Sequence, residues 1–237
     1  MVPVAVTGAR IVRAAASALA AAALTAGLAS SASATGASAA IITPQQWIHV
    51  TASSYTSTYA RFTAWQLESG HWVRIFGPWT ARVGYNGIAP PGRKREGDGR
   101  TPSGTYGLPF LFGVNSRPSG VAWPLCARGK FSRCWRHAYR FDVWDDDPAS
   151  PRYNTWCNVT YQACGTAPEP MHNVPVYDYA AVIGYNLART PGRGSAVFLH
   201  VGNGGTTAGC VSLPVTELLR VLRWLRPGSD PQITIRG

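Results

Sequence analysis

The sequence predicts a mostly β fold with one main α-helix near the C-terminus. Residues 62–68 and 71–76 alternate apolar and polar side chains on either side of Ser69-Gly70, as in a β-hairpin with a two-residue turn. Residues 179–185 and 196–201 form short apolar runs, which are typical of buried strands. An amphipathic segment follows at 214–225.

The remaining elements follow from similar local signals. The predicted helix over 214–225 has leucines on one face, with Ser212 as its expected cap and Gly228 as its expected stop. The ordered part is expected to begin within 43–51. Further short strands are predicted at 81–85, 105–108 and 232–235.

The N-terminus has the composition of a secretory signal peptide. Arg10 and Arg13 precede an Ala/Leu-rich run over 14–28, which is short for a membrane span, and small residues follow up to Ala34. We therefore expect a signal peptide at 1–34, cleaved after Ala34 or at a second site near Ala39, a short linker at 35–46 and one folded domain at 47–237. The mature protein is then secreted and has no stable membrane association.

The chain is basic, with 22 Lys and Arg residues against 11 Asp and Glu residues among 237, and a formal net charge of +11. An exported basic protein suits an anionic cell wall, although a merely soluble basic surface explains the charge equally well. The arginines are dispersed, which argues against nucleic acid as a partner.

The five cysteines are an odd number, so an exported protein has one thiol left over. Cys126, Cys134, Cys157 and Cys164 lie close together in a loop-rich region, and three pairings of these four are open. Local pairing is the simplest. Cys210 is the expected free thiol in each case.

A glycine-rich loop separates His200, expected at a strand end, from Cys210, expected at a helix start. A neighbouring imidazole, a helix N-terminus and free backbone N–H groups all favour a reactive thiolate, and the N–H groups also suit an oxyanion. The alternatives are a structural histidine and half of a disulfide. Val201 offers no polar side chain to orient the imidazole, so a main-chain carbonyl is expected to do so.

Two other regions are interpreted as non-catalytic. Residues 84–107, with Arg93, Lys94, Arg95 and Arg100, are expected to form a solvated loop. Residues 113–170 have little periodicity and are expected to form a disulfide-containing insertion, in which His137 and the acidic run 145–147 face solvent.

Four segments carry a family resemblance. They read G-D-G-R-T-P-S-G-T-Y at 97–106, G-Y-N at 184–186, F-L-H at 198–200 and T-A-G-C-V at 207–211. In this order they resemble the L,D-transpeptidase catalytic domain of the YkuD/ErfK type, as in secreted actinobacterial members. The resemblance covers the chain from about Ile48 to the C-terminus and implies a YkuD-like β-sandwich acting as a catalytic domain over 47–237.

The resemblance also implies an activity in cell wall biogenesis and cell shape. Cys210 matches the nucleophile and His200 the base, while the Gly209 and Cys210 amides match the oxyanion donors in a loop with Thr207 and Ala208. The enzyme would attack the third residue of a peptidoglycan tetrapeptide stem, release D-alanine and form a 3-3 cross-link, with no cofactor and no metal. Further candidates for substrate binding are Tyr106, Asn186 and His172.

Departures from the family pattern leave other functions open. Ala208 stands where the family has histidine, Ser212 stands where it has a basic or amide residue, and the spacer from His200 to Cys210 is short. Water as acceptor would make an L,D-carboxypeptidase or murein peptidase. A catalytically impaired wall-binding domain is a second alternative, and a zinc peptidase using His200, Cys210 and His172 is a third. The sequence does not define the acceptor or the oligomeric state.

Overall fold

The computed structural model describes residues 44–127 and 129–237. The predicted signal peptide, 1–34, and most of the predicted linker, 35–46, lie outside the described residues. The first strand already begins at Gln46.

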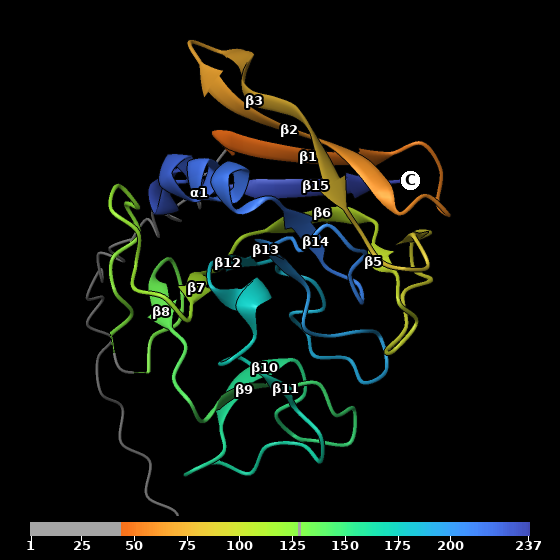
Figure 1. Cartoon of the computed structure of the whole chain (residues 1–237), viewed down its shortest axis with the longest axis vertical. Coiled ribbons are helices and arrows are strands. Elements are labelled where there is room, and N and C mark those ends of the chain that lie inside the picture. The colour runs from red at the N-terminus through yellow and green to blue at the C-terminus, as the bar shows by residue number, and fades with distance from the viewer. Residues whose placement is uncertain (1–43, 128) are drawn as a thin grey trace, which may run out of the picture. The chain divides into compact units, whose positions relative to one another are not determined.

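Ten strands form one mixed, curled sheet, in the order β6-β15-β1-β2-β3-β14-β13-β12-β7-β8 (Figure 1). A three-stranded sheet, β10-β9-β11, and the short pair β4-β5 complete the β structure. Among the described residues, α1 (Val215–Trp224) is the one α-helix. The 3₁₀ turns are η1 (Pro175–Tyr177) and η2 (Pro227–Ser229). The strands are β1 (Gln46–Ala52), β2 (Tyr59–Glu68), β3 (His71–Arg82), β4 (Ile88–Ala89), β5 (Thr101–Pro102), β6 (Gly104–Gly107), β7 (Leu111–Gly113), β8 (Trp135–His137), β9 (Asp142–Asp145), β10 (Thr155–Asn158), β11 (Glu169–Pro170), β12 (Ala180–Val182), β13 (Phe198–Val201), β14 (Val211–Leu213) and β15 (Gln232–Arg236).

The predicted hairpin is confirmed as β2 and β3. Glu68 pairs with His71 across a turn in which Ser69 and Gly70 both have positive φ, as a type I′ turn requires. The prediction of a separate strand at 81–85 is wrong. Residues 81 and 82 belong to β3, which continues until Arg82 pairs with Ser212 of β14, and the chain then turns away.

The prediction of a main helix near the C-terminus is also confirmed, but its predicted ends are not. Ser212 lies within β14, and Pro214 occupies the N-cap position without a side-chain hydrogen bond. The helix ends at Trp224, before Gly228, which belongs to η2. Leu218 and Leu222 on its apolar face are fully buried in the main core.

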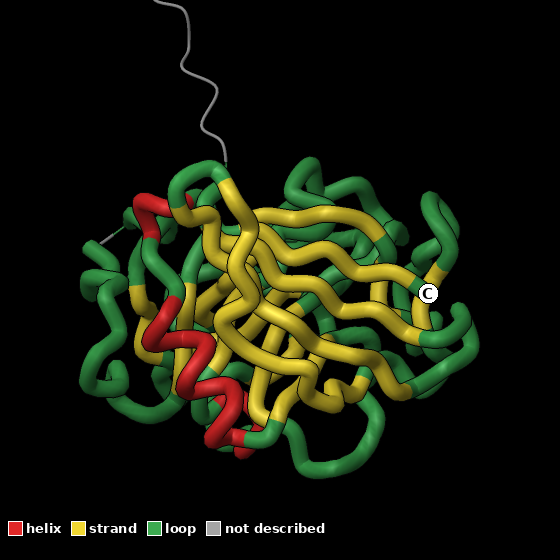
Figure 2. The backbone as a smooth tube through the Cα atoms, turned by 90° about the horizontal axis from the view of Figure 1, so that it is seen from above, coloured by secondary structure: helices red, strands yellow, loops and turns green. Residues whose placement is uncertain are grey.

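The antiparallel part of the sheet has two unlike faces. Ile48, Val50 and Phe62 point into the main core that α1 also joins. Alternate residues, such as Trp47 and Thr51, point to the other face, because successive side chains of a strand point to opposite sides. Figure 2 shows β1, β2 and β3 lying across this face, and no helix formed by residues 44–127 or 129–237 covers them.

The predicted disulfide-containing insertion is confirmed, and the pairing left open by the sequence is the local one: Cys126 with Cys134, and Cys157 with Cys164. The insertion is more ordered than expected, since it contains β8, β9, β10 and β11. Disulfides are typical of proteins from oxidising compartments. Within 44–127 and 129–237, no helix is long and apolar enough to cross a membrane.

Two side chains of the insertion that were expected to face solvent are buried or half-buried. Asp145 is fully buried, and its carboxylate accepts hydrogen bonds from the Ser150 hydroxyl and the Gly165 N–H. His137 is half-buried, with its ring 4.6 Å from that of Tyr139. The acidic run is therefore a structural turn, because its first carboxylate is used inside the insertion.

Candidate functional site

Cys210 is the free cysteine of the chain, since the other four form the two disulfides. It lies immediately before β14 and five residues before α1 begins at Val215. The expectation that Cys210 starts a helix is therefore wrong. The field of a helix N-terminus falls off within its first turn, so α1 is not the source of thiolate stabilisation here.

His200 and Cys210 lie on the same face of two neighbouring parallel strands. Leu199 of β13 pairs with Val211 of β14, which sets Cys210 beside Phe198 and two residues from His200 along the strand. Because side chains alternate, Phe198 and His200 share a face. The Cys210 thiol is on that face too, since it packs in the same cluster as Phe198. The register thus places Cys210 near His200 on one face, but no hydrogen bond joins the two side chains among the described residues.

The thiol is buried and engaged by the main chain. Its sulfur accepts a hydrogen bond from the Phe198 N–H, and its S–H donates to the Ala196 carbonyl, both at 3.3 Å. Ala196 has φ +51°, a left-handed conformation that is uncommon for a residue with a Cβ. Burial raises the pKa of the Cys210 thiol to about 12. In this structure Cys210 is a protonated thiol.

The imidazole of His200 is also buried. Its Nδ1 lies 2.8 Å from the Val201 carbonyl oxygen, which fits the expectation that a main-chain carbonyl orients this ring. Burial lowers the pKa of His200, so the ring is neutral at neutral pH. A neutral ring that donates from Nδ1 has an unprotonated Nε2, which is the form needed to take a proton from a thiol.

The segment 84–107 packs against Cys210, so the expectation of a solvated loop is wrong for its most important residues. The Thr101 and Thr207 hydroxyls both donate to the Cys210 carbonyl, at 2.8 Å. Thr101 is fully buried and also accepts a hydrogen bond from the Gly84 N–H. The motif at 97–106 therefore contacts the motif at 207–211 through Thr101 and Cys210, which are 109 residues apart in the sequence.

Lys94 places a buried positive charge next to the Cys210 loop. The side chain is nearly inaccessible, and its ammonium forms a 2.5 Å ion pair with Asp98 and donates to the Arg95 carbonyl. A Cβ on Gly209 would lie 3.7 Å from Nζ. After burial, the Phe198 N–H hydrogen bond lowers the pKa of Cys210, Glu169 raises it, and the Lys94 ammonium lowers it by the smallest amount.

The residues predicted to border an oxyanion site have different environments. The Gly209 N–H donates to the Thr207 hydroxyl at 3.2 Å, whereas Ala208 is exposed. Gly209 has φ +147°, and a Cβ there would lie 3.0 Å from the Arg100 carbonyl oxygen. Glycine is therefore required at 209 by both conformation and space.

The three further candidates for substrate binding are not joined to Cys210 or His200 by any hydrogen bond described in the structure. The Tyr106 hydroxyl donates to the Ser103 carbonyl, and burial raises the pKa of Tyr106 well above its usual range. Asn186 has φ +50° and bonds the Thr190 and Gly194 carbonyls, which makes it a turn residue. His172 follows the buried Met171, and its Nδ1 is buried without a hydrogen-bond partner among the described residues.

Sequence reasoning missed Tyr177, which connects the site to the insertion. Its ring meets that of His200 edge-on at 5.7 Å and that of Phe198 at 5.5 Å. Its hydroxyl donates to Glu169 at 3.0 Å, and burial, followed by Cys210 and Glu169, raises its pKa. No motif marks Tyr177, because its position depends on η1 folding back against β13.

The insertion also fixes the main chain that engages the thiol. The Asn154 amide oxygen accepts hydrogen bonds from the Ala196 N–H and from the Trp144 indole N–H, at 3.2 and 3.0 Å. The Asn154 amide nitrogen donates to the Tyr185 and Asn186 carbonyls. Ala196, whose carbonyl accepts the hydrogen bond from the thiol, is thus held in place by the insertion.

Comparison of the chain with protein-family models, curated proteins and solved structures finds no match. No group of three metal-ligating side chains gathers in the part of the chain that the structure describes, so the zinc alternative gains no support. The evidence on function therefore comes from the residues and contacts of this chain.

Proposed function

We propose that this protein is a secreted L,D-transpeptidase that uses Cys210 to transfer the acyl group of a peptidoglycan stem peptide. The reaction releases D-alanine from a tetrapeptide stem and joins the third residue to the amine of a second stem, which forms a 3-3 cross-link. Assignment to the YkuD type and its β-sandwich is part of the same proposal.

One observation carries the proposal: the quoted motifs converge on a free thiol that shares a strand face with a neutral imidazole. The 97–106 motif supplies Thr101, which donates to the Cys210 carbonyl, and the motif at 198–200 supplies His200. A structural cysteine needs only apolar packing. The buried Lys94 ammonium and the histidine oriented by its Nδ1 are instead the features that a cysteine nucleophile uses.

The proposed chemistry has two steps. His200 takes the thiol proton at Nε2, and the sulfur attacks the carbonyl carbon of the third stem residue. The C–N bond to D-alanine breaks, and the imidazolium returns its proton to the leaving amine. The amine of a second stem then attacks the thioester and gives its proton to His200, the C–S bond breaks, and the thiolate recovers that proton.

On this proposal, the thiol must leave its present hydrogen bonds before attack. The thiol donates a hydrogen bond to the Ala196 carbonyl, and its pKa is raised to about 12. The thiolate form is therefore scarce at neutral pH. Rotation of the thiol towards His200 breaks the bond to Ala196. The Phe198 N–H and, to a smaller extent, Lys94 favour the anion once it forms, while Glu169 opposes it.

The test is product analysis by mass spectrometry after incubation with a disaccharide-tetrapeptide. A cross-linked dimer and free D-alanine are expected from the wild type, and neither from Cys210→Ala. Tripeptide without dimer identifies water as the acceptor and replaces the transferase by an L,D-carboxypeptidase. An unchanged substrate with folded protein contradicts both activities and favours a wall-binding domain.

A further inference from the structure

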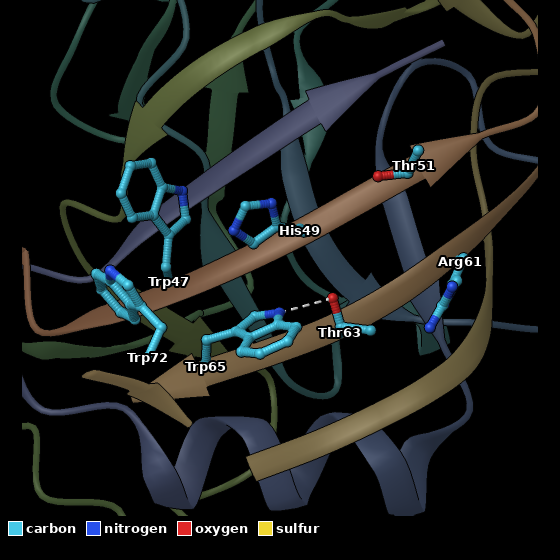
Figure 3. A pocket seen from close by; sticks show the side chains of 7 residues that line it. All are labelled: Trp47, His49, Thr51, Arg61, Thr63, Trp65 and Trp72. Atoms are coloured by element: carbon cyan, nitrogen blue, oxygen red, sulfur yellow. Dashed lines mark hydrogen bonds between the residues drawn. The ribbon is translucent and has the colours of Figure 1, made fainter. Parts of the chain in front are cut away.

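A tryptophan-lined groove lies on the face of the sheet opposite the main core, and neither the motifs nor the proposed chemistry explain it. The groove has a volume of about 530 Å³ and is lined by side chains of β1, β2 and β3. Trp47, Trp65 and Trp72 lie together at one end (Figure 3). Trp72 is 38% exposed, which is unusual for so large an aromatic side chain.

The groove changes character along its length. Three cross-strand pairs line it: Trp47 with Trp65, His49 with Thr63, and Thr51 with Arg61. The first pair is aromatic and the last is polar and cationic, as Figure 3 shows. Thr51 lies four positions after Trp47, so the lined stretch is about 14 Å long, which suits a ligand of more than one ring.

The tryptophan rings are held in place before any ligand arrives. The Trp47 indole N–H donates to the Thr234 hydroxyl at 2.7 Å, and the Trp65 indole N–H donates to the Thr63 hydroxyl at 3.0 Å. Trp47 and Trp72 meet edge-on with ring centroids 5.5 Å apart. Because both indole donors are satisfied within the sheet, the rings offer a ligand their apolar faces rather than their N–H groups.

The charged residues in and near the groove restrict the class of ligand that it can bind. None of the groove's lining residues, all within the described ranges, is acidic, while Arg61 lines it and the Arg74 guanidinium lies 5.9 Å from the centre of the Trp65 ring. The pKa of His49 is lowered by burial and by Arg236, so its neutral ring both donates and accepts hydrogen bonds. A ligand with oxygen acceptors and no positive charge is favoured.

We propose that this groove binds the sugar rings of a glycan chain. A pyranose ring combines an apolar C–H face, which stacks on an indole, with hydroxyls at its edge, which match the threonine, histidine and arginine groups farther along. A proline ring also stacks on indole but carries no hydroxyls for the polar end. The groove residue of β3, Trp72, lies ten positions from Arg82, where β3 pairs with β14 next to Cys210, so this is a second site. Only the choice of an amino-sugar chain as probe rests on the proposed function.

The test is a titration of the Cys210→Ala protein with a β-1,4-linked hexamer of N-acetylglucosamine, followed by tryptophan fluorescence and calorimetry. We expect saturable binding that Trp72→Ala weakens by about tenfold, or about 1.4 kcal/mol, because the variant loses the indole face on which a sugar ring would stack. Trp72→Phe retains a ring and should retain most of the binding. Arg61→Ala should weaken binding less.

The matched control is Tyr161→Ala, which removes an aromatic side chain that is 73% exposed in the insertion, away from the groove. It should leave binding unchanged. Absence of saturable binding at millimolar hexamer, equal binding by Trp72→Ala, or binding of a proline-rich peptide in place of the hexamer would overturn the proposal. Thioester formation by otherwise wild-type Trp72→Ala with a soluble stem fragment is expected to be normal, so failure at one site is distinguishable from failure at the other.

Discussion

The long hairpin and the three strands around Cys210 are built in different ways. β2 and β3 have 10 and 12 residues and pair mainly with each other, while β12, β13 and β14 have three, four and three residues. The short strands are held by side chains from distant segments, such as Thr101 and Asn154. The hairpin therefore presents an open groove, whereas the Cys210 thiol is buried and hydrogen-bonded to the main chain.

The largest expected difference in stability between the two regions comes from replacing one glycine in each by alanine. Gly209→Ala forces a Cβ onto φ +147° within 3.0 Å of the Arg100 carbonyl, and we expect a loss of about 3 kcal/mol or more of folding free energy. Gly70→Ala in the hairpin turn meets no atom within 4 Å and is expected to cost about 1 kcal/mol, from its φ of +83° alone. Urea unfolding of both variants measures the difference. Equal losses of folding free energy would show that the backbone at Gly209 is no more restricted than the backbone at Gly70.

The disulfide between Cys157 and Cys164 is expected to stabilise the insertion rather than the hairpin. It closes a loop with a sequence separation of 7, so replacing both cysteines by alanine should lower the free energy of unfolding by about 2.5 kcal/mol. Hydrogen exchange should quicken around Asn154 and Ala196 and stay unchanged in β2 and β3. Faster exchange in the hairpin as well would contradict the separation of the two regions.

A pair of threonine variants sharpens the comparison at the level of single hydrogen bonds. Thr101→Val removes the hydroxyl that links Gly84 and the Cys210 carbonyl in a fully buried position, and should cost about 2 kcal/mol. Thr51→Val changes an exposed groove residue and should alter stability by less than about 0.5 kcal/mol. Thermal unfolding of the two variants tests this. We also expect slower acylation only in Thr101→Val.

A final expected effect is on the pH dependence of stability. The pKa of the Cys210 thiol is raised from 9.0 to about 12 in the folded protein, so the folded state holds this proton more tightly than the unfolded chain. The contribution is fully present below pH 9 and is lost as the pH rises towards about 12. The wild type should therefore lose more stability than Cys210→Ala over this range. If the free energy of unfolding depends on pH in the same way in both proteins, the pKa of the Cys210 thiol is not raised by folding.

The sequence predicted the parts of the molecule that depend on local pattern. Alternation around Ser69-Gly70 defined the hairpin, and leucine spacing defined the helix. The ends of elements were less predictable: β3 continues past residue 80 because Arg82 pairs with β14, a contact that no local signal encodes. Likewise, Cys210 precedes a strand because β14 completes the sheet between β3 and β13.

Some residues of the candidate site were likewise predictable from local sequence, and others were not. Cys210 and His200 were found from residue type and from the odd number of cysteines. Lys94 was interpreted as one charge in a solvated loop, since nothing in its neighbours indicates that Asp98 folds it inward. Tyr177 was missed because η1 reaches β13 only in the folded chain. The tryptophan groove was missed because its aromatic residues come from three strands.

The central claim is that Cys210 forms a thioester with the acyl group of a stem peptide. The most direct test is the intact mass of the protein during incubation with a disaccharide-tetrapeptide, followed by mapping of the modified peptide. We predict an increase equal to the substrate minus D-alanine, located on Cys210, absent in Cys210→Ala and reduced in His200→Gln. A folded wild type with a titratable thiol and no such adduct, or an adduct on another residue, would contradict the claim.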